Sequence, residues 1–254
     1  MAVINNFGGF YRTEYYVHEA RMLGGRIHAP CVNHSRWLTH LEGSDIYLGL
    51  VHLKGMEQQV AARIAAQRDK GGPFRSLEDF VQRVEIETAQ LELLIRIGAF
   101  RFTGLSKCAL LWQKNAVHNP RTPFSHDGKF WDTTAEHYEL PNLPEGPYDQ
   151  AFDEIELLGF PLDSPFKLLQ KDFPEDVPAC ELPHHLGRMI HLVGYYVVRK
   201  EVRTVRKETM FFGPWLDREG RYFDTVHFPG FMQQAPFRGK GIYRIRGKVV
   251  EEFG

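Results

Sequence analysis

Residues 53–69 have the sequence Leu-Lys-Gly-Met-Glu-Gln-Gln-Val-Ala-Ala-Arg-Ile-Ala-Ala-Gln-Arg-Asp. A turn at Lys54 and Gly55 leads directly into a run whose apolar residues recur at helical spacing. The first amides of a helix have no partner inside the helix and lie at the positive end of its dipole, so they favour an anion. Glycine has no side chain, so a phosphate could approach the backbone at Gly55 closely. The stretch therefore predicts a helix start that can hold a phosphate.

Further helix signals follow this stretch at short intervals. Gly71–Pro73 interrupts the first helix, and Ser76 starts a second one in a near capping box. Thr88 can cap a third helix and Ser106 a fourth, which would continue to Ala116. Because the connections are short, these helices predict a compact helical bundle over residues 53–117.

Residues 1–52 predict a helix that begins at Thr13, followed by two short strands, Trp37–Glu42 and Asp45–His52, that form a hairpin. No folding nucleus is evident before this helix, so we expect the chain to be a piece of a longer protein. After residue 117 five prolines interrupt every pattern up to Asp149, which predicts a linker or an irregular wrapping loop.

A short helix, Gln150–Leu158, would then place Phe152, Ile155 and Leu158 on one side. From residue 189 onward the pattern changes to that of strands, which predicts a small antiparallel barrel or sandwich. The expected strands are Met189–Val198, Thr209–Leu216, Tyr222–Phe228 and Ile242–Val250.

One residue of these strands is unusual, because Pro214 inside the second strand predicts an edge strand or a bulge. Only four strands fit, so a five-stranded barrel would lack its last strand or close with other residues. The fold class expected from the whole chain is multidomain α + β, with a small helical bundle followed by an antiparallel β barrel.

Composition limits the possible partners and sites. The 31 basic and 32 acidic residues nearly cancel, so a nucleic acid would have to be bound by local clusters of charge. Three cysteines without C-x-x-C spacing indicate structural thiols in a reducing cytoplasm. No apolar run is long enough to span a membrane. The histidines lack the spacing of a zinc peptidase, so no metal site is expected.

Five short motifs occur in order along the chain, and each alone is weakly specific. They are His18–Arg21 with Pro30–Asn33, Lys54–Arg68, Gly72–Phe80, Leu94–Phe100 and Glu156–Leu162. In this order they resemble the bacterial DNA polymerase III α subunit, in the region that follows the polymerase palm. The resemblance implies the end of the fingers region in residues 1–52, a tandem helix-hairpin-helix domain in 53–117, a Pro-rich linker with short helices in 118–186 and an OB-fold domain in 187–254.

The same resemblance implies that the catalytic residues lie outside this segment. Polymerases of this kind hold two metal ions with clustered aspartates, and in this family those aspartates lie upstream of the segment present here. The parent would be a DNA-directed DNA polymerase that needs magnesium. This segment is expected to have no catalytic residue and no cofactor of its own, and to be inactive alone.

Two groups of residues are expected to bind DNA. Backbone amides and basic side chains near the first helix start would bind duplex phosphates without regard to base sequence. An ordinary solvated helix face with a lysine cluster near its end is the alternative. The duplex candidates are Lys54, Gly55, Met56, Arg63, Arg68 and Lys70.

The second group lies in the β-rich region. The densest basic run, residues 199–207, would connect strands one and two of an OB fold and lie beside aromatic side chains that can stack on single-stranded bases. Such aromatic residues are more often part of the core, so we rank the basic loop above them. The single-strand candidates are Arg199, Lys200, Arg203, Arg206, Lys207, Tyr195, Phe211 and Trp215.

The expected function is therefore a non-catalytic arm that grips duplex and single-stranded template DNA during replication. The resemblance also implies the sliding clamp and other replisome subunits as partners, although the nearest clamp-binding candidate, Thr122–Phe124, matches the family peptide poorly. A protein-interaction module that recruits replication factors is one alternative. The same region of an error-prone polymerase paralogue is another.

Overall fold

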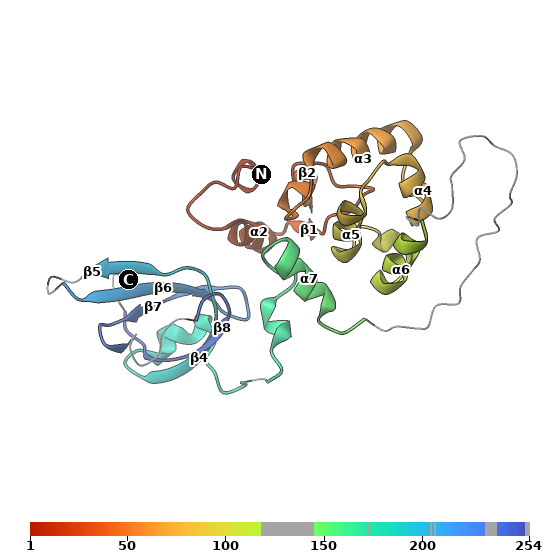
Figure 1. Cartoon of the computed structure of the whole chain (residues 1–254). Coiled ribbons are helices and arrows are strands. Elements are labelled where there is room, and N and C mark those ends of the chain that lie inside the picture. The colour runs from red at the N-terminus through yellow and green to blue at the C-terminus, as the bar shows by residue number, and fades with distance from the viewer. Residues whose placement is uncertain (118–144, 172, 204, 206, 232–237, 252–254) are drawn as a thin grey trace, which may run out of the picture. The chain divides into compact units, whose positions relative to one another are not determined.

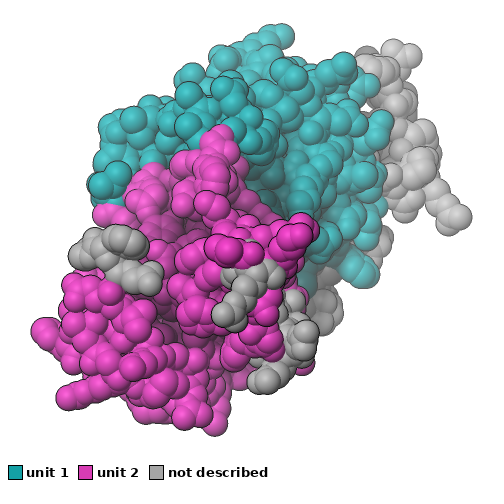
Figure 2. Space-filling view, turned by 90° about the vertical axis from the view of Figure 1, so that its left-hand side faces the viewer, with its two compact units in different colours: residues 1–8, 23–162 teal, residues 9–22, 163–254 magenta. Residues whose placement is uncertain are grey.

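The computed structural model describes residues 1–117, 145–171, 173–203, 205, 207–231 and 238–251 (Figure 1). The chain divides into two compact units, which Figure 2 shows in different colours. Unit 1 consists of residues 1–8 and 23–162, and unit 2 of residues 9–22 and 163–254. The clamp-binding candidate Thr122–Phe124 and most of the Pro-rich stretch lie outside the described residues.

Unit 1 begins with a short helix, α1 (Ala2–Asn5), and a small three-stranded sheet. Strands β2 (His40–Glu42) and β3 (Asp45–Tyr47) pair antiparallel, which confirms the expected hairpin, and β1 (Arg26–His28) adds an unexpected parallel strand beside β3. The predicted continuation of the strand to His52 is wrong, because residues Leu50–His52 form the 3-10 helix η1. Leu48, Gly49 and Leu50 are all buried, whereas a strand with one solvent-exposed face would alternate.

The remainder of unit 1 is a helical bundle. Its helices are α3 (Gln58–Gly71), α4 (Leu77–Arg83), α5 (Thr88–Arg96), the 3-10 helix η2 (Arg101–Thr103), α6 (Lys107–Val117) and α7 (Asp149–Leu157). Figure 1 shows α3 to α6 grouped together with α7 beside them. The rings of Phe74, Phe80 and Phe100 meet edge to face, with centroids 4.9 and 5.0 Å apart, and all three side chains are buried.

Local sequence explains where these helices begin and end. The Ser76 hydroxyl accepts a hydrogen bond from the Asp79 amide at 3.1 Å, so the predicted cap of α4 is confirmed. Helix α3 ends at Gly72, whose φ of 74° is accessible mainly to glycine. The residue that precedes α5 is Glu87, so Thr88 is the first helical residue and not the expected cap.

Within its described residues, unit 2 is built on an antiparallel sheet of five strands. They are β4 (Met189–Tyr196), β5 (Lys200–Arg203), β6 (Thr209–Leu216), β7 (Tyr222–His227) and β8 (Ile242–Lys248). The four expected strands are confirmed, whereas β5 lies within the predicted basic loop. Strand β6 pairs with β7 along one edge and with β5 and then β4 along the other, and β8 pairs with β4. In the part of the chain that the structure describes, β7 and β8 do not pair, so the OB-fold-like sheet stays open.

Pro214 does not mark an edge strand, because β6 has neighbours on both sides. Its carbonyl accepts from the Val197 amide at 3.3 Å, at the point where the partner of β6 changes from β5 to β4. In an antiparallel strand the N–H and C=O of one residue point to the same side. The missing N–H of Pro214 therefore lies at this break, where it disrupts no regular ladder.

Two buried clusters lie on the sheet of unit 2. One contains Trp215 and Phe223, and the other contains Tyr195, Leu216 and Tyr15 of α2 (Thr13–Met22). Helix α2 is where the sequence predicted it, and it groups with this sheet, which differs from the sequence-based division at residue 52. The 3-10 helices η3 (Pro165–Leu168) and η4 (Ala179–His185) precede the sheet.

Candidate nucleic-acid interface

The turn Leu53–Glu57 precedes helix α3 in unit 1. It belongs to the first hairpin of the helical bundle and is called the hairpin turn. The Lys54 amide donates to the Leu157 carbonyl of α7 at 2.8 Å, and the Met56 amide donates to the Leu53 carbonyl at 3.1 Å. Gly55 is exposed and has a φ of 82°, a backbone conformation that side chains disfavour. The turn thus has the glycine where its geometry needs one.

A buried side chain of helix α5 holds the turn from behind. The side-chain oxygen of Gln90 accepts from the Glu57 amide at 3.0 Å, and its nitrogen donates to the Gly55 carbonyl at 2.7 Å. Gln90 is only 7% exposed. Gln90 is not among the residues predicted from sequence, although it lies four positions before Leu94 and so belongs to the buried stripe of α5.

Four backbone amides near the turn have no hydrogen-bond partner among the residues that the structure describes. They belong to Gly55, Gln58, Gln59 and Val60. Glu57 precedes the helix without making a side-chain cap. The Met56 amide, which we expected to bind phosphate, is already paired, so that donor role is corrected to Gly55 and the first turn of α3.

The basic candidates of unit 1 fall into different environments. Lys54 is exposed beside the turn, whereas Lys70 is exposed in the last turn of α3, a helix about 20 Å long. The Arg68 guanidinium donates to the Val32 and Ser35 carbonyls at 2.8 and 3.0 Å, and its partial burial lowers its pKa. Arg68 therefore joins α3 to the segment Val32–Ser35, and its contact with DNA stays a prediction. Arg63 is half-buried, and its buried Nε has no partner among the described residues.

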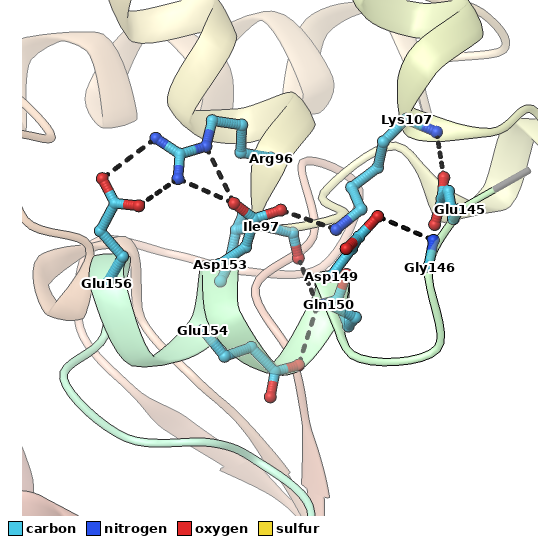
Figure 3. A network of polar contacts seen from close by, with 10 residues as sticks. All are labelled: Arg96, Ile97, Lys107, Glu145, Gly146, Asp149, Gln150, Asp153, Glu154 and Glu156. Atoms are coloured by element: carbon cyan, nitrogen blue, oxygen red, sulfur yellow. Dashed lines mark hydrogen bonds and ion pairs between the residues drawn. The ribbon is translucent and has the colours of Figure 1, made fainter. Parts of the chain in front are cut away.

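The second hairpin lies around Leu91–Gly98, and with the segment from Glu85 that precedes it, it carries acidic residues and one arginine that is already engaged. Arg96 of α5 pairs with Asp153 at 2.8 Å and with Glu156 at 2.5 Å, as Figure 3 shows. These hydrogen bonds raise the pKa of Arg96 and lower that of Glu156. Lys107 donates to the other oxygen of Asp153 at 2.7 Å (Figure 3). Exposed Glu85 and Glu87 lie before α5, so this hairpin presents negative charge where the first one presents Lys54.

Two aromatic residues expected to stack on bases belong to the core of unit 2. Tyr195 is 5% exposed and donates to the Glu14 carboxylate at 2.7 Å, and Trp215 is 1% exposed. Trp215 also donates from its indole to the Thr225 hydroxyl at 2.7 Å. Both predictions of base stacking are therefore wrong, because each ring is used in packing and in a hydrogen bond.

The remaining candidates of unit 2 divide between the two faces of the sheet. Arg199 lies over the ring of half-buried Phe211, with its guanidinium carbon 5.0 Å from the ring centroid. Lys200 is opposite Phe212, so it lies on the other face, whereas Arg203 is opposite Thr209 and shares the face of Phe211. These cations are exposed, as is Lys207, which follows β5. Arg206 lies outside the described residues.

The face of Phe211 extends to two residues that are not among the predicted DNA contacts. His227 is directly opposite Phe211 on β7, and the ring of Phe231 lies 5.7 Å from the ring of His227. Phe231 is 46% exposed. This set, Arg199, Arg203, Phe211, His227 and Phe231, is called the β5–β7 face below.

The described residues contain no group of three or more histidine, cysteine, aspartate or glutamate side chains placed to hold a metal ion. No helix among them is both long and apolar enough to cross a membrane.

Comparison of the sequence with protein-family models identifies a known motif in unit 1. Residues 24–110 match the model of the helix-hairpin-helix motif. This range contains the hairpin turn, Gln90 and the second hairpin, which are the elements that the geometry brings together.

The related proteins are DNA polymerases. The chain is 35% identical over 117 residues to the error-prone DNA polymerase of Mycobacterium bovis and 37% identical over 123 residues to that of Nocardia farcinica, in each case over 44% of this chain. It is 31% identical over 173 residues, 64% of this chain, to the DNA polymerase III subunit alpha of Staphylococcus aureus. These matches span 10, 11 and 16% of the respective relatives. The chain thus carries a helix-hairpin-helix region and is similar in sequence to part of DNA polymerase III alpha and error-prone DNA polymerases.

Proposed function

We propose that this chain is a non-catalytic DNA-binding part of a bacterial DNA polymerase, and that unit 1 grips duplex DNA through its first hairpin. The observation that supports this most directly is the group of free amides at Gly55 and the first turn of α3, with exposed Lys54 beside them. Amides of this kind bind phosphate oxygens and do not read bases. Such contacts suit a protein that holds DNA of any sequence.

In this proposal the first hairpin contributes most of the phosphate binding of unit 1. Arg96 is neutralised by Asp153 and Glu156, and the exposed glutamates before α5 would repel a phosphate. The second hairpin therefore serves packing. Residues of α7 neutralise its arginine and also accept the Lys54 amide, so α7 braces both hairpins.

We further propose that unit 2 binds single-stranded template through its β5–β7 face. Arg199 and Arg203 are exposed cations beside a partly exposed aromatic surface. Single-strand binding generally combines basic residues that follow the backbone with rings on which bases stack. No step of nucleotidyl transfer is assigned to residues of this chain.

Fluorescence anisotropy with labelled oligonucleotides tests the proposal. The folded chain should bind both duplex and single-stranded DNA, with affinity that falls steeply as salt rises, because phosphate contacts release counterions. The logarithm of the association constant should fall by about 0.9 per phosphate contact for each tenfold rise in salt. A folded chain that fails to bind, or binds independently of salt, would reject the proposal. Retention of replication proteins by such a chain would favour the interaction module.

The relatives include both replicative and error-prone polymerases, so the similarity supports a polymerase origin common to both. Phosphate binding by backbone amides suits either enzyme, because each must hold a product duplex regardless of its sequence.

A further inference from the structure

The hydrogen bonds of the hairpin turn, counted group by group, leave one turn amide for a ligand. The amides of Lys54 and Met56 donate to Leu157 and Leu53, and the amide of Glu57 donates to Gln90. Within the described part of the chain, the Gly55 amide has no acceptor. Its carbonyl, by contrast, accepts from the nitrogen of Gln90.

We propose that Gln90 is a positioning residue for phosphate binding, which fixes the hairpin turn so that the Gly55 amide stays available to DNA. This inference rests on the proposed function of the turn. A single side-chain amide joins the carbonyl of Gly55 to the amide of Glu57, so it sets the peptide planes on both sides of Met56. With both groups bonded, the two peptide planes are held in place, and the direction of the neighbouring Gly55 amide is constrained with them.

Burial makes this role specific to Gln90. At 7% exposure it has little competition from water, and each of its two polar atoms makes a hydrogen bond to the turn. Leucine in its place would leave the Gly55 carbonyl and the Glu57 amide without partners. We expect the turn to relax toward other backbone conformations, in which water reaches the Glu57 amide and the Gly55 amide loses its fixed direction.

The test compares Gln90→Leu with the parent chain and with Gln82→Leu, the same change at an exposed position of α4. Hydrogen exchange at the Glu57 amide should become at least about tenfold faster in Gln90→Leu only, since that amide loses its acceptor. Duplex affinity should fall about three- to tenfold, with a salt slope smaller by about one phosphate contact. Single-strand affinity should remain that of the parent. Gln90→Asn, whose shorter side chain keeps the polar amide, serves if the leucine variant fails to fold.

Three results would overturn the inference. Unchanged exchange at Glu57 would show that Gln90 does not hold the turn. Faster exchange with the duplex affinity and salt slope of the parent would show that the turn needs no such brace to bind DNA. Equal losses of duplex and single-strand affinity would show that Gln90 supports the protein as a whole and does not position the turn specifically. A parent chain that fails to bind duplex would reject the proposed function itself, while exchange at Glu57 would still decide whether Gln90 braces the turn.

Discussion

Glu57 places a carboxylate directly before α3, next to the amides that we assign to phosphate. Its side chain makes no cap hydrogen bond and is exposed. Glu57→Gln should therefore raise duplex affinity about two- to fivefold at low salt, because it removes a like charge near the ligand. Anisotropy titrations at two salt concentrations would measure this, with the gain shrinking at high salt. A loss of affinity would instead assign Glu57 a supporting role in the turn.

The free energy of unfolding should depend on pH through His52, which directly precedes the hairpin turn. Its Nε2 lies 2.8 Å from the Thr39 hydroxyl, which also accepts from the Gly49 amide, so that hydroxyl donates to a neutral imidazole. Burial lowers the pKa of His52 from 6.5 to about 4. A depressed histidine pKa gives stability that is complete above pH 6.5 and is lost as pH falls through about 4. The loss attributable to His52 is about 3 kcal/mol.

Urea unfolding of the parent and of His52→Gln at pH 7 and pH 4 would isolate this contribution. Other histidines whose pKa is lowered, such as His40 and His227, remain in both proteins and cancel in the comparison. The parent should lose about 3 kcal/mol more than the variant between the two pH values. Equal losses would contradict the assignment of a buried neutral His52.

At the scale of elements, sequence patterns predicted the positions of the helices well, but they predicted less well which side chains of each helix are buried. The cap at Ser76 and the glycines after α3 and α5 are local signals, and the structure has helices where they predict them. Helix α7 also lies where expected, but Phe152 on its expected apolar side is 60% exposed, whereas Glu154 is buried. Glu154 accepts from the Leu162 amide and from Gln150, a tertiary arrangement that periodicity does not encode.

Strand β5 shows a similar limit. Its residues Lys-Glu-Val-Arg are mostly charged, so they carry no apolar alternation, and the strand forms because β6 offers an open edge at Phe212 to Thr209. The same pairing places Lys200 and Arg203 on opposite faces. Sequence alone could place the basic run but could not divide it, because the division depends on strand register.

Because Arg203 and Lys200 lie on opposite faces of the sheet, charge reversals on the two faces should differ in their effect on single-strand binding. Arg199→Glu together with Arg203→Glu should weaken single-strand binding at least about tenfold, because both cations lie on the β5–β7 face with Phe211. Lys200→Glu, one charge reversal on the opposite face, should have an effect of less than about twofold. Anisotropy with an unstructured pyrimidine oligonucleotide measures both. A larger effect from Lys200→Glu would move the binding surface to the other face.

At the scale of the whole molecule, we propose that unit 1 binds duplex DNA and that unit 2 binds single-stranded DNA. The chain has a formal net charge of −1, so binding must come from local surfaces and not from an overall attraction. Changes in unit 1 should accordingly affect duplex binding, and changes in unit 2 should affect single-strand binding. Sites in separate units should also contribute almost additively when combined.

The central claim is that the first hairpin binds duplex phosphates, and the charge reversal Lys54→Glu tests it most directly. The control is Lys248→Glu, an identical change at an exposed residue of β8 in unit 2. Duplex titrations across a salt series should show a loss of at least about tenfold for Lys54→Glu and a salt slope smaller by about one. Lys248→Glu should leave both values within about twofold of the parent. Equal duplex affinity and salt slope for parent and Lys54→Glu would contradict the account.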